Sequence, residues 1–167
     1  MSGTKPETIN ALKSAYPQLA ASEFRGATRV VVPRDQLDAV MSILRDERGF
    51  DYLVDVTCVD YLHYDGATDR FGLVYLLAST TTNERITVRV LLNEPDLTVP
   101  SMTSRWEGAN WMEREVYDMF GIIFDGHPDH RRILMPDDAT CYPLRKDYPL
   151  QGRGERHNLP IITRAAT

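Results

Sequence analysis

Residues 50–58 read FDYLVDVTC, and they are followed by FGLVYLL at residues 71–77 and by RITVRVLL at residues 85–92. In the first and third stretches apolar and polar residues alternate, as in strands that have one buried face. Val59 and Tyr61 fall out of phase with the alternation, which predicts a bulge near them. One face of the first strand is predicted to carry Phe50, Tyr52, Val54, Val56 and Cys58. The connections are short and polar, so we expect an antiparallel meander.

Two helices and a further strand are predicted before this meander. Apolar residues recur at steps of three and four between Pro6 and Pro17, which indicates a short amphipathic helix. Residues 29–33, RVVVP, are typical of a strand. A helix then begins at Asp35, as its N-cap, and its predicted buried stripe is Leu37, Val40, Met41 and Leu44.

A third helix is predicted after the meander, from about Glu107 to Phe120, with Gly121 as its C-cap. Its apolar stripe would be Ala109, Met112, Val116 and Met119. Charged residues alternate along the last strand, which indicates that one face of the sheet meets water. The expected fold is therefore a two-layer α+β domain, with helices packed on one face of a largely antiparallel sheet.

Composition excludes several classes of protein. A chain of 167 residues fits one domain that needs no metal or disulfide for its stability. The formal charge of −5 disfavours a general binder of nucleic acid or of anionic membranes. Hydrophobic residues at 43% and charged residues at 26% exclude wholesale disorder and coiled-coil composition.

The two cysteines, Cys58 and Cys141, lie too far apart for a C-x-x-C motif. This chain alone therefore predicts neither a zinc ribbon nor a cysteine-ligated iron–sulfur cluster, and a reducing compartment fits best. The N-terminus lacks the apolar stretch of a secretory signal. No apolar run approaches the roughly 20 residues that span a bilayer, so membrane association is expected only through a partner.

Residues 125–167 differ in composition from the rest of the chain. They hold five of the ten prolines, show no periodicity and carry a net charge of +1, against −6 for residues 1–124. Disordered tails are poor in large apolar residues, yet this stretch carries ten, namely Ile133, Leu134, Met135, Tyr142, Leu144, Tyr148, Leu150, Leu159, Ile161 and Ile162. We therefore predict an α+β body at 1–120 and an extended, proline-rich, partner-binding arm at 121–167.

Charged residues are densest between residues 111 and 134. A free-standing hydrolase or isomerase could use Glu113 or Glu115 as general base and His127 as proton carrier, although no nucleophile signature accompanies them. A simpler interpretation is stronger. Arg114 and Asp118 lie four residues apart on a helix, which fits a solvated charged face with one weak ion pair.

Other motifs give weaker signals. His127 and His130 could supply two metal ligands, but no third cysteine or histidine lies nearby, so a metal site is disfavoured. Gly152-x-Gly154 lacks the third glycine of a dinucleotide-binding turn. The proline-bracketed strip PLRKDYP at residues 143–149 could contact RNA or dock a protein, and the acidic body favours protein docking.

Three stretches form a long pattern that is varied in residue type: ERE-x-YDMFGI (113–122), F-x-GHPD-x-RRIL (124–134) and PLRKDYPL (143–150). They closely resemble the signature of the respiratory complex I 30 kDa subunit family, in its separate form that is not fused to a 49 kDa-type subunit. A weaker similarity, LVD-x-T-x-VDY at 53–61, extends the resemblance across most of the chain. Where the family usually has Gly-His before Pro-Leu-Arg-Lys-Asp, this chain has Cys141-Tyr142, which departs from the pattern.

The resemblance implies a non-redox structural subunit in the hydrophilic arm of a proton-translocating NADH:quinone oxidoreductase. It would position the 49 kDa-type subunit and the subunit that holds the terminal iron–sulfur cluster. NADH, FMN, the clusters and quinone would belong to other subunits, so no catalytic, cofactor-binding or metal residue is expected here. The resemblance also implies a peripheral location on the cytoplasmic face of the bacterial inner membrane, and no nucleic-acid partner. Related subunits occur in membrane-bound hydrogenases and F420-dependent dehydrogenase complexes, and these remain alternatives.

The partner interface is expected on the turn 121–134 and on the strip 143–150. Four basic residues would pair with acids of neighbouring subunits, namely Arg131, Arg132, Arg145 and Lys146, and three rings would act as anchors, namely Tyr117, Tyr142 and Tyr148. The predicted interface residues are Glu113, Arg114, Glu115, Tyr117, Asp118, Gly121, His127, Pro128, Arg131, Arg132, Leu144, Arg145, Lys146, Asp147 and Tyr148.

Overall fold

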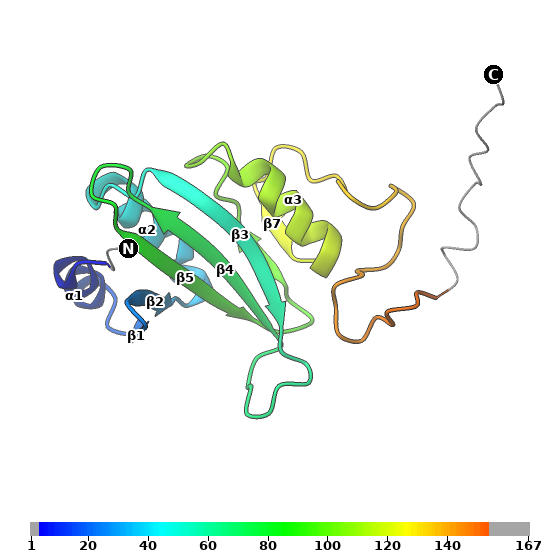
Figure 1. Ribbon diagram of the computed structural model, residues 1–167. Coiled ribbons are helices and arrows are strands. Elements are labelled where there is room, and N and C mark those ends of the chain that lie inside the picture. Colours follow the sequence, from blue (N-terminus) through cyan, green and yellow to red (C-terminus); the bar gives the residue numbers. More distant parts are fainter. Residues whose placement is uncertain (1–3, 154–167) are drawn as a thin grey trace, which may run out of the picture.

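A five-stranded sheet forms the centre of the protein in the computed structural model, which describes residues 4–153 (Figure 1). The strand order is β1-β2-β5-β4-β3, with β1 (Ala20–Phe24), β2 (Ala27–Val31), β3 (Tyr52–Asp60), β4 (Phe71–Ala78) and β5 (Arg85–Leu92). The meander β3-β4-β5 is antiparallel, and β2 joins it parallel to β5. The predicted α+β class with a largely antiparallel sheet is therefore confirmed.

Within these residues three helices accompany the sheet: α1 (Pro6–Ala15), α2 (Leu37–Ser42), which continues into one π-helical turn (Ile43–Glu47), and α3 (Ala109–Phe120). The stripe predicted for the second helix is fully buried. The N-cap predicted at Asp35 is wrong, because this residue lies in a 3₁₀ turn (Arg34–Gln36) and its side chain caps no helix. Gly121 ends α3 in the left-handed conformation, as predicted.

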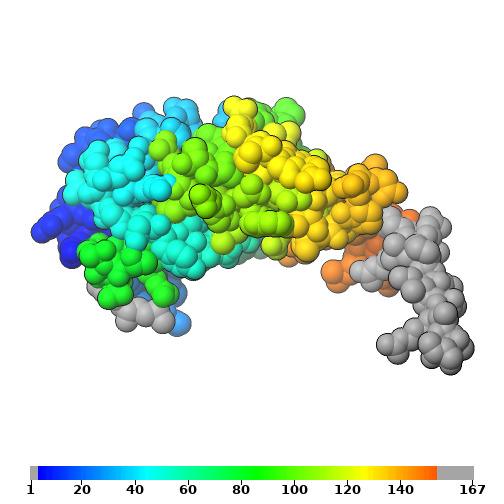
Figure 2. All heavy atoms as spheres, turned by 90° about the horizontal axis from the view of Figure 1, so that it is seen from above, coloured from blue at the N-terminus to red at the C-terminus, as the bar shows by residue number. Residues whose placement is uncertain are grey.

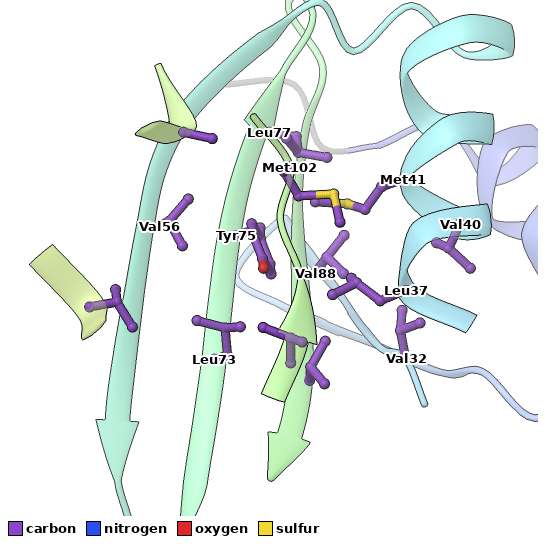
Figure 3. Close-up of a cluster of buried hydrophobic side chains, with 14 of the residues drawn as sticks. Val32, Leu37, Val40, Met41, Val56, Leu73, Tyr75, Leu77, Val88 and Met102 are labelled. Atoms are coloured by element: carbon purple, nitrogen blue, oxygen red, sulfur yellow. The ribbon is translucent and has the colours of Figure 1, made fainter. Parts of the chain in front are cut away.

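One face of the sheet packs with the helices into a single hydrophobic core (Figure 3). Leu73, Tyr75 and Leu77 of β4 point into it, and Met41 of α2 meets Met102 there. In Figure 1, α2 lies behind β3, β4 and β5. The polar alternation on β5 is explained by this arrangement, because its even-numbered residues face the core and its odd-numbered residues face away.

Two predictions about strands are wrong. The bulge of β3 lies between Leu53 and Asp55 and not near Val59, so the predicted face is broken. A bulge reverses which side successive residues face; Tyr52 therefore points outward while Val56 remains buried. The second is an omission, because no strand is predicted between the first helix and residues 29–33, where the structure has β1. Strand β1 is an edge strand with four of five residues exposed, so it carries no alternation of apolar and polar residues.

The core continues beyond the predicted domain boundary at residue 120. Strand β7 (Ile123–Asp125) pairs parallel with β6 (Thr98–Pro100), and Ile122 and Phe124 are buried beside it. From Gly126 to Arg153 the chain has no helix or strand. Residues 154–167 of the predicted arm lie outside the described residues. Among residues 4–153, every helix is too short or too polar to cross a bilayer.

Candidate functional site

Helix α3 carries polar side chains into the interior of the protein. Glu113 and Asp118 are completely buried, and Arg114 is nearly so. The solvated charged face with an Arg114–Asp118 ion pair is therefore a wrong prediction. Arg114 instead donates hydrogen bonds to the backbone carbonyls of Arg131 and Arg132, both at 3.0 Å. The helix thus uses its charges to hold the chain that follows it.

Asp118 is the centre of this attachment. Its Oδ1 accepts a hydrogen bond from Arg132 Nη1 at 2.6 Å, and its Oδ2 accepts the backbone N–H groups of Ile133, Leu134 and Met135 at 2.7–3.0 Å. Burial acts to raise the pKa of the Asp118 carboxyl, but these donors together hold that pKa below its ordinary value. Consecutive N–H groups around a carboxylate form an anion-binding nest. We call this arrangement the Asp118 clasp.

Arg145 makes a second attachment at the end of α3. Its Nε donates to the carbonyl of Phe120 at 2.6 Å, and its Nη1 pairs with Glu94 Oε1 at 2.8 Å. The guanidinium also lies over the rings of Phe71 and Tyr142. A β-carbon on Gly121 would lie 2.7 Å from the Tyr142 ring, so only glycine permits this approach.

An ionic network completes this attachment. Arg70 pairs with Glu94 at 2.7 Å and with Asp147 at 2.9 Å, while Asp60 accepts the backbone N–H of Lys146 at 2.8 Å. Residues from the meander thereby bind the strip 143–150. Asp60, Arg70 and Glu94 were not predicted from the sequence. The only signal was Asp60, which lies within the weakly similar stretch 53–61.

The structure pairs Arg131, Arg132 and Arg145 with acids of their own chain, and their expected pairing with acids of neighbouring subunits stays a prediction. Their partners are Asp129, Asp118 and Glu94 respectively. A buried arginine needs an ionic or carbonyl partner, and the body supplies Asp118 to Arg132 and Glu94 to Arg145. Lys146 is exposed, and its pairing with a neighbour stays a prediction.

His127 and His130 both form hydrogen bonds with backbone groups. His127 Nδ1 accepts the N–H of Asp129 at 3.0 Å, so its Nε2–H donates to the carbonyl of Asn110 at 3.1 Å. His130 Nε2 accepts the N–H of Phe124 at 3.0 Å, and burial lowers the pKa of its imidazole. No hydrogen bond within residues 4–153 joins His127 to a glutamate, and no group of three potential metal ligands occurs there.

Glu113 is buried apart from the exposed Glu115, so the set expected for acid–base catalysis is not brought together. Its carboxylate accepts Ser101 Oγ–H at 2.6 Å and the N–H of Met102 at 2.7 Å, and no cation lies within ion-pair distance among the described residues. Burial raises the pKa of Glu113 from 4.5 to about 7.

Replacing Glu113 by Gln should therefore raise the free energy of unfolding above pH 7. In the wild type the carboxyl group of Glu113 binds its proton more tightly in the folded state than in the unfolded state. Its stabilisation is complete below about pH 4.5 and is lost as the pH rises through about 7. Glutamine carries no charge, its Oε1 can accept the N–H of Met102, and its Nε2 can donate to Ser101 Oγ, so both contacts can be kept. Urea titrations between pH 4 and 8 should show a smaller pH dependence for Glu113→Gln, while the exposed control Glu115→Gln should follow the wild type. Parallel curves for Glu113→Gln and wild type would contradict this.

The structure divides the predicted interface residues by exposure. The buried ones are Glu113, Arg114, Asp118 and Gly121; the half-buried ones are Tyr117, His127, Arg132, Arg145 and Tyr148; the exposed ones are Glu115, Pro128, Arg131, Leu144, Lys146 and Asp147. Exposed apolar side chains accompany the last group: Trp111, Ile123, Leu134 and Leu150. Figure 2 shows residues 120–150, yellow to orange, running from the middle of the molecule toward one end. We call the exposed side chains of residues 131–150 the outer rim.

Comparison with known proteins gives a consistent result. The family model described as "Respiratory-chain NADH dehydrogenase, 30 Kd subunit" matches residues 30–154. One NADH-quinone oxidoreductase subunit of Citrifermentans bemidjiense, designated C, is 48% identical over 134 residues, which cover 80% of this chain and 81% of that protein. The equally named protein from Moorella thermoacetica is 43% identical over 146 residues, covering 87% and 96%.

Solved structures also resemble this one. A trypsin-resistant fragment (1–134) of Nqo5 is 37% identical with a TM-score of 0.67, and it covers 72% of this chain and 97% of that chain. A chain of an archaeal membrane-bound sulfane sulfur reductase has a TM-score of 0.75 and covers 96% and 95%, at 22% identity. The second likeness shows the fold alone.

Proposed function

Because this chain belongs to the family of the 30 kDa subunit of respiratory-chain NADH dehydrogenase, we propose that it is a non-redox structural subunit of a proton-translocating NADH:quinone oxidoreductase. Its task is to hold the subunits that carry the terminal iron–sulfur cluster and the quinone site. Electron transfer and a shared quinone pocket both demand accurate positions, so a rigid support contributes to turnover without reacting itself.

One observation carries this proposal: residues 131–150 are fixed to the body on one side and present apolar side chains on the other. The Asp118 clasp and Arg145 form the inner side. Leu134 is 62% exposed, Leu144 52% and Leu150 96%. A segment that is already ordered loses little conformational entropy when a partner covers it. The outer rim is therefore suited to protein docking.

We further propose that no chemistry occurs on this chain. Of the residues considered for acid–base catalysis, Glu113 and His127 already have other partners and Glu115 is exposed; Cys58 is buried, and burial raises the pKa of its thiol to about 12. NADH, FMN, the iron–sulfur clusters and quinone are then held by other subunits. The relatives are named as subunits of the whole enzyme, which supports this division of labour.

The proposed neighbours are the 49 kDa-type subunit and the subunit with the terminal iron–sulfur cluster. The proposed location is the cytoplasmic face of the bacterial inner membrane, with attachment through those partners. The outer rim supports this arrangement, because its leucines, with Lys146 between them, offer an apolar surface with a charged edge.

The test replaces two leucines of the outer rim, Leu134 and Leu144, by Asp in the native organism. Each apolar anchor contributes roughly 1.5–3 kcal/mol when buried, so the double variant should reduce co-purification with the NADH:quinone oxidoreductase subunits at least tenfold. The far-UV circular dichroism and melting temperature of the isolated chain should stay unchanged. Ala15→Asp, at an exposed position at the end of α1, is the control and should assemble normally. Normal assembly and quinone reductase activity of the double variant would refute the proposal.

A further inference from the structure

The sheet face that points away from the core carries no helix within residues 4–153. Alternation and register place a defined set of side chains there. Their rows run across β2, β5, β4 and β3: Arg29, Thr87, Leu76 and Asp55; Val31, Arg89, Val74 and Thr57; Leu91, Gly72 and Val59; Arg85, Ala78 and Tyr52. We call these residues the open face.

Charge on the open face is opposite to that of the body. Three arginines lie there, Arg29, Arg85 and Arg89, against one acid, Asp55. Residues 1–124 as a whole carry a net charge of −6. Arg29 and Arg89 form no ion pair with any described residue; each instead lies over a ring, of Phe24 and Tyr61 respectively. These two arginines therefore do not serve to neutralise acids of their own chain.

Two hollows interrupt the open face. The first, of about 250 Å³, is lined by Leu76 and Thr87, with Arg25 and Arg85 among its other walls. The second, of about 210 Å³, lies between the β3–β4 loop and Arg89, and its lining includes Tyr61, Tyr64 and one acid, Asp69. Exposed apolar residues belong to the same region: Tyr64 and Leu91 line the second hollow, and Tyr52 and Val59 lie on β3. The face thus combines an apolar floor with a basic edge.

We propose that the open face docks an acidic, amphipathic segment of a neighbouring subunit. The apolar side of such a segment would cover Leu76 and Leu91, and its carboxylates would pair with Arg29 and Arg89. Complementary charge favours this partner over a neutral one and excludes a basic one. The inference rests on the proposed function, because the neighbour is a subunit of the same assembly. It adds a second surface, on another face of the molecule from the outer rim.

An anionic membrane would fit this face less well. A flat layer of lipid headgroups would reach the arginines but would leave the two hollows unfilled. A helix or strand has a ridge of side chains that can enter the hollows. The acidic remainder of the body would also be repelled by anionic lipid.

Photo-crosslinking in the assembled complex tests the proposal. Benzoylphenylalanine is introduced at Thr87, in the middle of the open face, and the complex is irradiated in native membranes. The matched control position is Glu107, an exposed residue just before α3. Cross-linked peptides are identified by mass spectrometry. Arg89→Glu, the charge-conserving Arg89→Lys and the remote charge reversal Lys13→Glu are compared in the same background.

The expected product from position 87 is one segment with net negative charge and apolar residues at helical or strand spacing. Arg89→Glu should lower its yield at least fivefold, while Arg89→Lys and Lys13→Glu should not. The proposal would be overturned by a lipid adduct, by the absence of a protein adduct, or by a cross-linked segment without excess acidic residues. It would also be overturned if the yield did not change in Arg89→Glu. The failure of the proposed function looks different: the chain would then be absent from the purified NADH:quinone oxidoreductase, whatever position 87 captures.

Discussion

Asp118→Ala is expected to lower the free energy of unfolding by about 3–5 kcal/mol, because it removes one member of a buried, hydrogen-bonded ion pair. Arg132 would lose its carboxylate, since its side chain is only 9% exposed and its remaining partners are carbonyls. Three neighbouring amides would lose their acceptor as well. Residues 131–135 should therefore detach from α3.

Hydrogen exchange measures this detachment directly. The amides of Ile133, Leu134 and Met135 should exchange much faster in Asp118→Ala, and trypsin should cut after Arg132, whose side chain is only 9% exposed in the wild type. Asp138→Ala, an exposed acid of the same segment, is the control and should change neither. Unaltered protection of the three amides in Asp118→Ala would show that the clasp does not hold the segment.

The same variant separates two roles of the signature residues. If the clasp only stabilises the body, complexes that contain Asp118→Ala should be scarce but fully active. If it also orders the outer rim for docking, affinity for the neighbouring subunits should fall even at a temperature where the body remains folded. The second result is expected, because Leu134 is positioned by the backbone that Asp118 binds.

The sequence predicted the fold better than the site. The fold follows mainly from patterns among neighbouring residues, whereas the contacts of the site join residues that are far apart in the sequence. Local periodicity is enough to identify the meander and the stripe of Leu37 and Val40. The bulge at Val54 was misplaced because residues 52–54 are all apolar, so either phase of the strand looks suitable for the core. Strand β1 pairs only at an edge and leaves no pattern in its side chains.

The partners of the buried charges are not local. Asp118 contacts residues 14 to 17 positions later, and Asp60 contacts a residue 86 positions later. Helical spacing paired Arg114 with Asp118 because they are four residues apart, yet both bind the returning chain instead. The signature residues were therefore found by sequence, but their role as internal supports of the outer rim needed the fold.

Gly121→Ala is expected to destabilise the protein by about 2–5 kcal/mol through two separate costs. Gly121 has φ of +80°, where a side chain costs about 1–2 kcal/mol. Its new methyl group would lie 2.7 Å from the Tyr142 ring and 2.8 Å from Arg145 Nη2, and such overpacking costs about 1–3 kcal/mol. The ring and the guanidinium must then move, which weakens the bond from Arg145 to the Phe120 carbonyl.

Gly126→Ala is a matched control for the first cost. Gly126 has φ of +78°, and a β-carbon there meets nothing within 4 Å. The difference between the two variants in urea denaturation therefore isolates the clash with Tyr142 and Arg145, and we expect Gly121→Ala to be the less stable by about 1–3 kcal/mol. Equal stabilities would mean that Tyr142 and Arg145 do not pack against the end of α3. A larger loss of stability in Gly121→Ala, accompanied by tryptic cleavage after Arg145, would show that the strip 143–150 packs against the end of α3 only because residue 121 is glycine.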